Sequence, residues 1–237
     1  IGLLITTLFV LNIERTDAMA RKMTLDSDVG AIGQELERKA SENTAYLRAA
    51  AALFGMAEDV SRDEFSRFVE QMSEGHSQRG SLGMGWAPWV PAGATAEFEA
   101  EQRALHPEMD SRIYPPPLPE QDRAVFALLD PRNGPNPRAL GFDMYSEVPR
   151  RTAMQQALRV NGPMASGRVQ LIQDAGKPPV GGVLIYLPVF DRLQGGKTGQ
   201  LKGFIYTPIR PADLLKTAIL GAHRNTGRVA IYDGAPD

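Results

Sequence analysis

The sequence lacks cysteine altogether and contains only three histidines among its 237 residues. Without cysteine the chain can form no disulfide, thiol nucleophile or cysteine-based zinc site, and the redox compartment is left open. The histidines, His76, His106 and His223, are far apart, and none has the spacing of paired metal ligands. We therefore expect solvated surface histidines, no metal site and no cofactor.

An excess of basic charge is also missing, because 26 Lys and Arg residues are balanced by 28 Asp and Glu residues. The chain contains no basic block interleaved with aromatic residues, which a surface that binds the phosphate backbone would need. Nucleic acid is therefore not an expected partner.

Catalytic motifs are absent from the sequence as well. No serine lies in a Gly-x-Ser-x-Gly turn, and no two carboxylates are marked by their context as an acid and a base. Residues 195–198, Gly-Gly-Lys-Thr, resemble the end of a phosphate-binding loop, but Asp191 stands where the first glycine of that loop should be. We expect a hairpin loop here, and a hydrolase is supported by no specific feature.

The chain begins with an apolar segment over residues 1–13, of which residues 1–10 are apolar apart from Thr6 and Thr7. A membrane span needs about 20 apolar residues, so this run fits the outer end of a truncated transmembrane segment. The alternative is an ordinary buried helix end. The basic region and small-residue cleavage site of a secretory signal peptide are not visible.

Residues 14–56 contain no proline and are rich in Ala, Glu, Leu, Arg and Lys, which favours one long helix of roughly 60 Å in a stalk of residues 14–60. An apolar seam with spacings of three and four fits a partner helix, including that of a second subunit. Packing on the body of its own domain explains the second half equally well. The seam residues are Val29, Ile32, Leu36, Ala40, Asn43, Leu47, Ala50 and Phe54.

The remainder of the chain alternates between helical and strand patterns, which predicts an α+β fold with antiparallel sheets. Ser61 and Glu64 have the spacing of a capping box before a helix, and Ser146 is a candidate N-cap for another. Residues 183–190 are almost continuously apolar, as in a central strand covered on both faces. We expect helices at 62–74, 95–105, 147–160 and 211–220, and strands at 82–90, 125–129, 168–173, 182–190, 201–208 and 228–232.

Asp143 lies between Phe142 and Met144, at the end of an apolar stretch and before a helix. One interpretation is a turn or helix N-terminal acid, which the helix dipole favours. The other is an acceptor for the N–H donors of a small polar ligand in a mostly apolar pocket.

Several further motifs follow one another in order between residues 61 and 220. They are Trp86 with Val90, Arg103, residues 140–146 (Leu-Gly-Phe-Asp-Met-Tyr-Ser), Arg150 with Arg151, residues 181–190 (Gly-Gly-Val-Leu-Ile-Tyr-Leu-Pro-Val-Phe) and residues 201–204 (Leu-Lys-Gly-Phe). Together they resemble the CHASE domain, an extracytoplasmic sensor of receptors that include histidine kinases, nucleotide cyclases and plant cytokinin receptors.

The resemblance implies a long stalk helix and two PAS-like subdomains. The membrane-distal subdomain would span about residues 80–190 and bind the ligand, and the membrane-proximal one would span about residues 191–237. In cytokinin receptors, an aspartate in the matching Phe-Asp-Met motif hydrogen-bonds an adenine-type ring, and this implies a binding role for Asp143. Two departures, Ala165 for a leucine and Asp174 for a threonine, change the shape and polarity of that pocket. The ligand-binding residues that we expect are Phe142, Asp143, Tyr145, Ala165, Asp174, Leu184, Tyr186, Gly203 and Phe204.

The sequence thus predicts a non-enzymatic sensor region of a receptor in the cell inner membrane, with this domain in the periplasm or outside the cell. Its expected partners are a small-molecule ligand, with an adenine-type compound as the candidate, and a second copy of the chain bound through the stalk. The alternative is a structural dimerisation module with a vestigial pocket.

Overall fold

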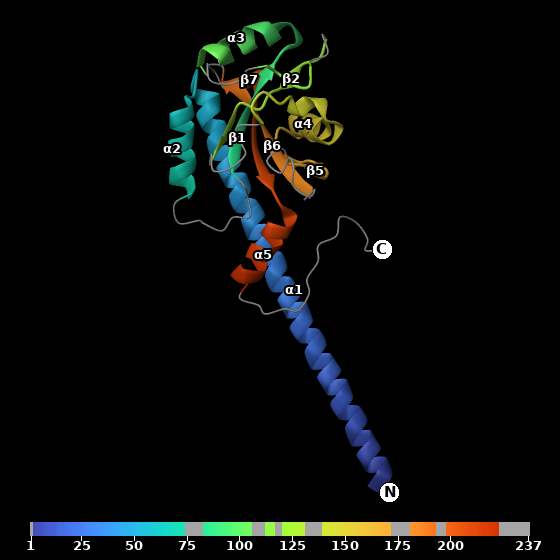
Figure 1. The fold of residues 1–237 in the computed structure, drawn as a ribbon. Helices are drawn as coiled ribbons and strands as arrows, with labels where there is room; N and C mark the ends of the chain where they lie inside the picture. Colours follow the sequence, from blue (N-terminus) through green and yellow to red (C-terminus); the bar gives the residue numbers. More distant parts are fainter. Residues whose placement is uncertain are drawn as a thin grey trace.

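A single long helix carries the rest of the molecule at its C-terminal end (Figure 1). The computed structural model describes residues 2–73, 83–105, 112–116, 120–130, 139–171, 181–192 and 198–222. Helix α1, Gly2–Met56, has 55 residues, which correspond to roughly 80 Å at about 1.5 Å per residue. The long helix predicted from the composition is confirmed, and it begins earlier than residue 14.

The C-terminal half of α1 packs against the body of the domain, whereas residues 15–27 are exposed. The predicted seam is confirmed at Ile32, Leu47, Ala50 and Phe54, which are buried. Ala40 is exposed and lies outside the buried line. Val29 is also exposed, and its packing against a second subunit stays a prediction. A straight helix turns about 100° per residue. The line of buried side chains therefore includes position 39, whereas position 40 points to its side.

Residue 39 is a lysine, which a search for apolar spacing passes over. Lys39 is only 6% exposed, and its ammonium group lies 3.7 Å from the Glu35 carboxylate on the same helix. A lysine can line a buried seam in this way because its methylene stem is apolar.

The body contains one curved sheet in which every strand pair is antiparallel. The path through the sheet is β2-β1-β7-β6-β4, with β3 also paired to β1 and β5 to β6. The predicted α+β fold with an antiparallel sheet is thereby confirmed. The strands are β1 Met84–Val90, β2 Arg123–Ala124, β3 Leu128–Asp130, β4 Met164–Ala165, β5 Val169–Gln170, β6 Gly181–Arg192 and β7 Thr198–Ile209.

Helices cover both faces of this sheet. Helix α4, Val148–Val160, packs on one face, which we call the α4 face. Helices α1 and α2, Arg62–Ser73, pack on the other, which we call the stalk face. β6 contributes Tyr186 to the α4 face and Leu187 to the stalk face, so the central strand predicted at 183–190 is covered on both sides.

Two further helices lie at the ends of the body (Figure 1). Helix α3, Thr95–Leu105, follows the short 3₁₀ helix η1, Ala92–Ala94, beyond the end of β1. Helix α5, Pro211–Gly221, follows β7 and packs along α1 below the sheet. Their positions in the chain agree with the helices predicted at 95–105 and 211–220.

The capping box predicted before α2 is present. The backbone N–H of Ser61 donates to Glu64 Oε2 at 2.9 Å, and the backbone N–H of Glu64 donates to Ser61 Oγ at 3.3 Å. The prediction of Ser146 as N-cap of α4 is wrong, because Glu147 occupies the cap position and makes no capping bond. Ser146 instead ends the 3₁₀ helix η3, Met144–Ser146, and its hydroxyl donates to the Asp143 carbonyl at 2.6 Å.

The strand predicted at 125–129 is divided between β2 and β3, since Val125 between them pairs with Asp143 in an isolated bridge. β4 has only two residues and was not predicted. The strand predicted at 228–232, residues 195–197 and the three histidines lie outside the described residues.

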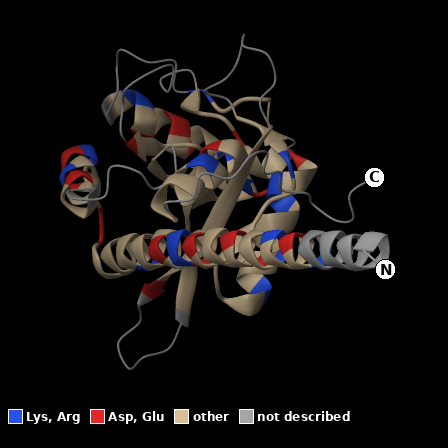
Figure 2. Ribbon diagram, turned by 90° about the horizontal axis from the view of Figure 1, so that it is seen from below, with Lys and Arg blue, Asp and Glu red and all other residues tan. Residues whose placement is uncertain are grey.

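β6 and β7 pair along most of their length, across the predicted boundary near residue 190. The division into a membrane-distal and a membrane-proximal subdomain stays a prediction. Lys and Arg residues are interspersed with Asp and Glu along the visible side of α1 (Figure 2). This mixture of signs matches the near-neutral composition.

Candidate functional site

Asp143 lies at the edge of the α4 face with its side chain only 4% exposed. Its Oδ1 accepts hydrogen bonds from the backbone N–H groups of Tyr145, at 2.9 Å, and Ala124, at 3.3 Å. The first of these bonds caps η3, and the second ties the loop to β2. The turn-capping interpretation therefore describes a contact that the structure contains, and the ligand-binding role of Asp143 stays a prediction.

Burial raises the pKa of the Asp143 carboxyl above its ordinary value of 3.8. The backbone N–H groups of Tyr145 and Ala124, together with the charges of Arg123 and Arg151, oppose this rise. A buried carboxyl surrounded by donors in this way can act as an acceptor without exposure to bulk water.

Basic side chains from α4 hold the loop around Asp143 in place. Arg151 Nη1 donates to the carbonyl groups of Tyr145, at 2.9 Å, and Ser146, at 3.2 Å. The guanidinium of Arg150, which is 2% exposed, lies 5.4 Å from the centre of the Phe142 ring and donates to the Gln170 carbonyl at 3.0 Å. The loop, α4 and β5 thus share one polar network.

The strand residues predicted for the site belong to the same apolar cluster. Leu184, Tyr186 and Phe204 are buried together with Phe142 on the α4 face. Tyr186 is 0% exposed, its hydroxyl donates to Met144 Sδ at 3.5 Å, and burial raises its pKa to about 12. Tyr145 packs edge-on against Trp89 at 5.1 Å. The structure therefore brings six of the nine predicted residues together: Phe142, Asp143, Tyr145, Leu184, Tyr186 and Phe204.

The other three predicted residues are placed differently. Ala165 is exposed on the short β4, opposite Ile185. Asp174 lies outside the described residues. Gly203 has a φ of +154°, and a Cβ at this position would lie 2.3 Å from the Ala87 carbonyl oxygen and 2.7 Å from Trp86 Cη2. The close approach of β1 therefore requires a glycine at this position.

A β-bulge beside Gly203 changes the direction of its neighbour. β6 and β7 pair as Val189 with Gly203 but Phe190 with Leu201, so Lys202 is the extra residue. Leu201 and Phe204 both pack toward the α4 face, while the Lys202 ammonium group reaches the C-terminal end of α1 on the stalk face. A bulge re-aims a side chain in this manner because it breaks the alternation of the strand.

Lys202 satisfies backbone carbonyls at the end of α1. Its ammonium group donates to the carbonyl oxygens of Phe54 at 3.0 Å, Ala57 at 2.7 Å and Glu58 at 3.3 Å. The last carbonyls of a helix have no partners within the helix, so this lysine joins the stalk directly to β7. No sequence motif pointed to this role, although a charged residue next to a glycine in an apolar strand is a signal for a bulge.

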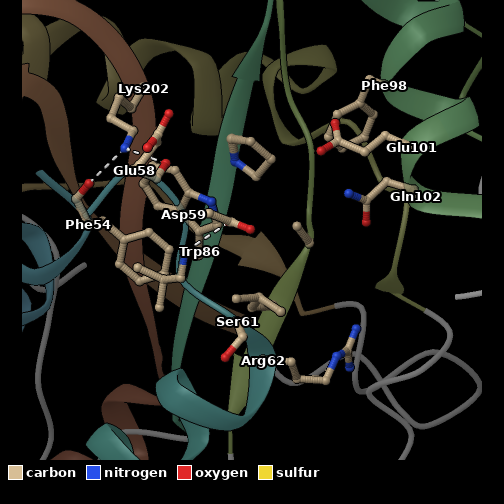
Figure 3. A pocket seen from close by; sticks show the side chains of 14 residues that line it. Phe54, Glu58, Asp59, Ser61, Arg62, Trp86, Phe98, Glu101, Gln102 and Lys202 are labelled. Carbon is tan, nitrogen blue, oxygen red and sulfur yellow. Dashed lines mark hydrogen bonds between the residues drawn. The ribbon is translucent and has the colours of Figure 1, made fainter. Parts of the chain in front are cut away.

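A cavity of about 340 Å³ lies beside this lysine, between the end of α1, β1 and α3 (Figure 3). None of the predicted site residues that the structure describes lines it. Its lining residues are Phe54, Glu58, Asp59, Val60, Ser61, Arg62, Trp86, Pro88, Phe98, Glu101, Gln102, Ala127, Leu128 and Lys202.

The comparison with known families decides the identity of this fold. The model of the CHASE domain matches residues 58–237, about three quarters of the chain. The chain belongs to the CHASE domain family. The resemblance in the ordered motifs is confirmed. CHASE domains are extracellular sensor domains of receptors and are not catalytic.

The CHASE match begins at residue 58, directly after α1 ends at Met56. The long helix therefore lies N-terminal to the matched sensor, and Lys202 joins the two. A comparison with curated proteins found no significant match. Among the residues described, no helix combines the length and apolar character needed to cross a membrane.

Proposed function

We propose that this CHASE domain is the extracytoplasmic, small-molecule-sensing region of a transmembrane receptor whose output is a histidine kinase or a nucleotide cyclase. In this proposal the domain lies in the periplasm or outside the cell and belongs to a receptor of the inner membrane. The observation that carries it is the CHASE match on a body mounted at the end of a 55-residue helix. A sensor needs such a rigid connection if its state is to reach another domain.

The proposed ligand site is the α4 face around Asp143, and the candidate ligand is an adenine-type compound. An ionised carboxylate offers about four lone-pair positions, of which the Tyr145 and Ala124 N–H groups use two at Oδ1. A ring N–H of the ligand can donate a hydrogen bond to a remaining lone pair of the Asp143 carboxylate. Phe142, Tyr145 and Phe204 supply aromatic surface for the ring of the ligand. Ala165 and Asp174 are proposed as further ligand-binding residues.

Transmission to the stalk is proposed to run along β7. Phe204 lies in the cluster beside the Asp143 loop, and Lys202, two residues away, holds the end of α1. A ligand changes this connection only if it binds one arrangement of β7 and α1 more tightly than the other. A displacement of the bulge by such a ligand would act directly on the last turn of the stalk.

The proposed dimer uses the exposed part of the stalk. Met19, Met23, Leu25 and Val29 are each more than 60% exposed, although they are large and apolar. Met19 and Met23 lie one turn apart on one side of α1, and Leu25 and Val29 form a second such pair on another side. The exposed pair at Met19 and Met23 supports a second copy of the helix as its partner. Analytical ultracentrifugation of the chain and of a Met23→Glu variant tests this part of the proposal, because a dimer through this surface should dissociate in the variant.

The experiment that tests the ligand site is a thermal-shift screen of adenine and its N6-substituted derivatives. A compound that binds only the folded state must raise the melting temperature. We expect a hit with the wild-type chain and a much smaller shift with Asp143→Asn, which keeps an acceptor oxygen for the two backbone N–H groups. Glu97→Gln on the exposed side of α3 is the matched control.

A hit that stabilises wild type and Asp143→Asn equally would show that the assigned role of Asp143 is wrong.

The second candidate function is a structural dimerisation module with a vestigial pocket. The engagement of Asp143 Oδ1 by two backbone groups favours it, since that contact gives the carboxylate a purely structural task. It predicts that the chain dimerises through the stalk and that no compound of the screen shifts the melting temperature.

A further inference from the structure

The cavity at the end of the stalk lies on the opposite face of the sheet from Asp143. Figure 3 shows Phe54, Glu58 and Asp59 on one side of it, and Phe98, Glu101 and Gln102 on the other. In the first group, Phe54 lies in the last turn of α1, and Glu58 and Asp59 come directly after that helix. The second group belongs to α3. With a volume of about 340 Å³, the cavity is in the range of small-molecule sites.

The inner wall of this cavity is aromatic. Trp86 and Phe54 stack with their ring centres 4.4 Å apart and an angle of 26° between their planes. Phe98 is half-buried on the α3 side, and Pro88 and Leu128 add further apolar surface. Such a wall binds an apolar body, and the face of a tryptophan also attracts organic cations.

The charged lining residues give the cavity an acidic balance. Glu58, Asp59 and Glu101 provide three carboxylates, against two basic side chains, Arg62 and Lys202. Of these two, Lys202 already donates to three carbonyl oxygens at the end of α1. Glu58 and Asp59 follow that helix end and Glu101 approaches from α3, so a positive group in the cavity can be attracted from two sides.

The chain at the end of α1 binds an ammonium group of the protein itself. The Phe54 carbonyl in the last turn of α1, at the negative end of the helix dipole, and the carbonyls of Ala57 and Glu58 just after the helix all accept from the ammonium group of Lys202. The distances, from 2.7 to 3.3 Å, are those of ordinary hydrogen bonds to an ammonium. Lys202 is therefore held by these carbonyl groups, and the groups that a cation in the cavity would meet are the carboxylates of Glu58, Asp59 and Glu101.

We propose that this cavity is a second binding site, for a small organic ammonium compound with an apolar body. The apolar body lies against Trp86 and Phe98, and the ammonium group lies among the carboxylates of Glu58, Asp59 and Glu101. A compound bound here touches the connection between Lys202 and α1, so it would modulate the stalk independently of the ligand proposed at Asp143. The proposal does not depend on the Asp143 site, since the two lie on opposite faces of the sheet.

The test uses three probes of one shape and different charge: 2-phenylethylammonium, 2-phenylethanol and phenylacetate. Each is titrated into the full chain and followed by calorimetry. We expect the ammonium compound to bind at least about tenfold more tightly than the neutral alcohol, and phenylacetate not to bind. Equal binding of the alcohol and the ammonium compound, or tighter binding of phenylacetate, would overturn the proposal.

Variants locate the bound cation. Glu101→Gln and Glu58→Gln remove one carboxylate each from exposed positions, so both should fold, and each should weaken 2-phenylethylammonium binding roughly three- to tenfold. Glu97→Gln, one turn before Glu101 on α3 and outside the cavity, should bind as wild type does. Unchanged binding in both cavity variants would refute the site.

A further variant separates this proposal from the one about Asp143. Asp143→Asn should leave 2-phenylethylammonium binding unchanged, whereas Glu101→Gln should leave the response to adenine derivatives unchanged. Loss of ammonium binding in Asp143→Asn would place the cation on the α4 face and contradict the second site.

Discussion

The two faces of the sheet differ in how they are packed. The α4 face contains a buried carboxyl and a buried arginine, both hydrogen-bonded to the backbone, beside a dense cluster of packed aromatic rings. The stalk face carries the long helix, and near its upper end the packing leaves a cavity. The difference fits the proposal that recognition takes place on the α4 face, while the stalk face carries the contacts to α1.

Both β6 and β7 contribute side chains to the two faces, and in β7 the bulge at Lys202 adds a contact with the end of α1. In a regular strand Lys202 would share a face with Phe204. The bulge places Phe204 on the α4 face and turns Lys202 toward α1. Substitutions can separate the contributions of the two faces to stability and to the proposed ligand response.

Gly203→Ala should be the most damaging substitution, because it affects both faces. The added Cβ would lie 2.3 Å from the Ala87 carbonyl oxygen at a φ of +154°. We expect a loss of about 3–4 kcal/mol in the free energy of unfolding, measured by urea denaturation. Gly33→Ala is the control, since a Cβ there would meet no neighbouring segment within 4 Å and alanine favours the helix. Equal stability of Gly203→Ala and wild type would refute the close approach of β1 and β7.

Arg150→Met should disrupt the α4 face alone. It removes the donor to the Gln170 carbonyl and the cation beside Phe142 in a fully packed environment. We expect a loss of about 2–3 kcal/mol, whereas Arg159→Met on the exposed side of the same helix should change stability by less than about 0.5 kcal/mol. Thermal and urea unfolding of both variants measure this. Similar losses in the two variants would contradict the buried network.

Much of this architecture could be predicted from the sequence, because it depends on local patterns. The capping box at Ser61 and Glu64, the proline at the start of α5 and the apolar run of β6 each determine their own element. The two-residue strand β4 and the division of residues 125–129 depend on pairing with distant segments. The bulge at Lys202 arises in the same way, from contacts between β6, β7 and α1 that no single window of sequence contains.

The candidate site was only partly predictable for the same reason. The Phe-Asp-Met motif led to Asp143 and its aromatic neighbours, which the fold gathers in one cluster. Gly203 was expected to bind the ligand, but its close contact with Ala87 is a property of two paired strands. The cavity beside Lys202 joins residues from α1, β1, α3 and β7, so no motif marks it.

Lys202→Met should weaken the connection to the stalk while it keeps the apolar stem. Three carbonyl groups at the end of α1 lose their donor, although water can replace part of it. We expect a loss of about 1–2 kcal/mol and faster amide hydrogen exchange in the last turn of α1. Lys216→Met on the exposed side of α5 should have neither effect. If the rate of amide hydrogen exchange in the last turn of α1 is the same in Lys202→Met and wild type, this lysine does not hold the helix end.

Asp143→Asn should give the smallest effect, visible as a dependence on pH. Burial raises the pKa of Asp143 in the folded state, so the folded chain binds the proton more tightly than the unfolded chain does. The resulting stabilisation is complete below the ordinary pKa of 3.8 and is lost as the pH rises through the raised value. The stability of wild type relative to Asp143→Asn should therefore fall with rising pH in urea titrations. A relative stability that increases with pH would mean that the donors around the carboxylate outweigh its burial.

The assignment of recognition to the α4 face is tested most directly by nuclear magnetic resonance. The amide groups of Ala124 and Tyr145 both donate to Asp143 Oδ1, and they report on any ligand that contacts this carboxylate. On titration with an adenine derivative that stabilises the chain, we predict the largest shifts at these two amides and at Phe204. Shifts confined to the stalk face, at Asp59 and Gln102, would contradict a ligand site at Asp143.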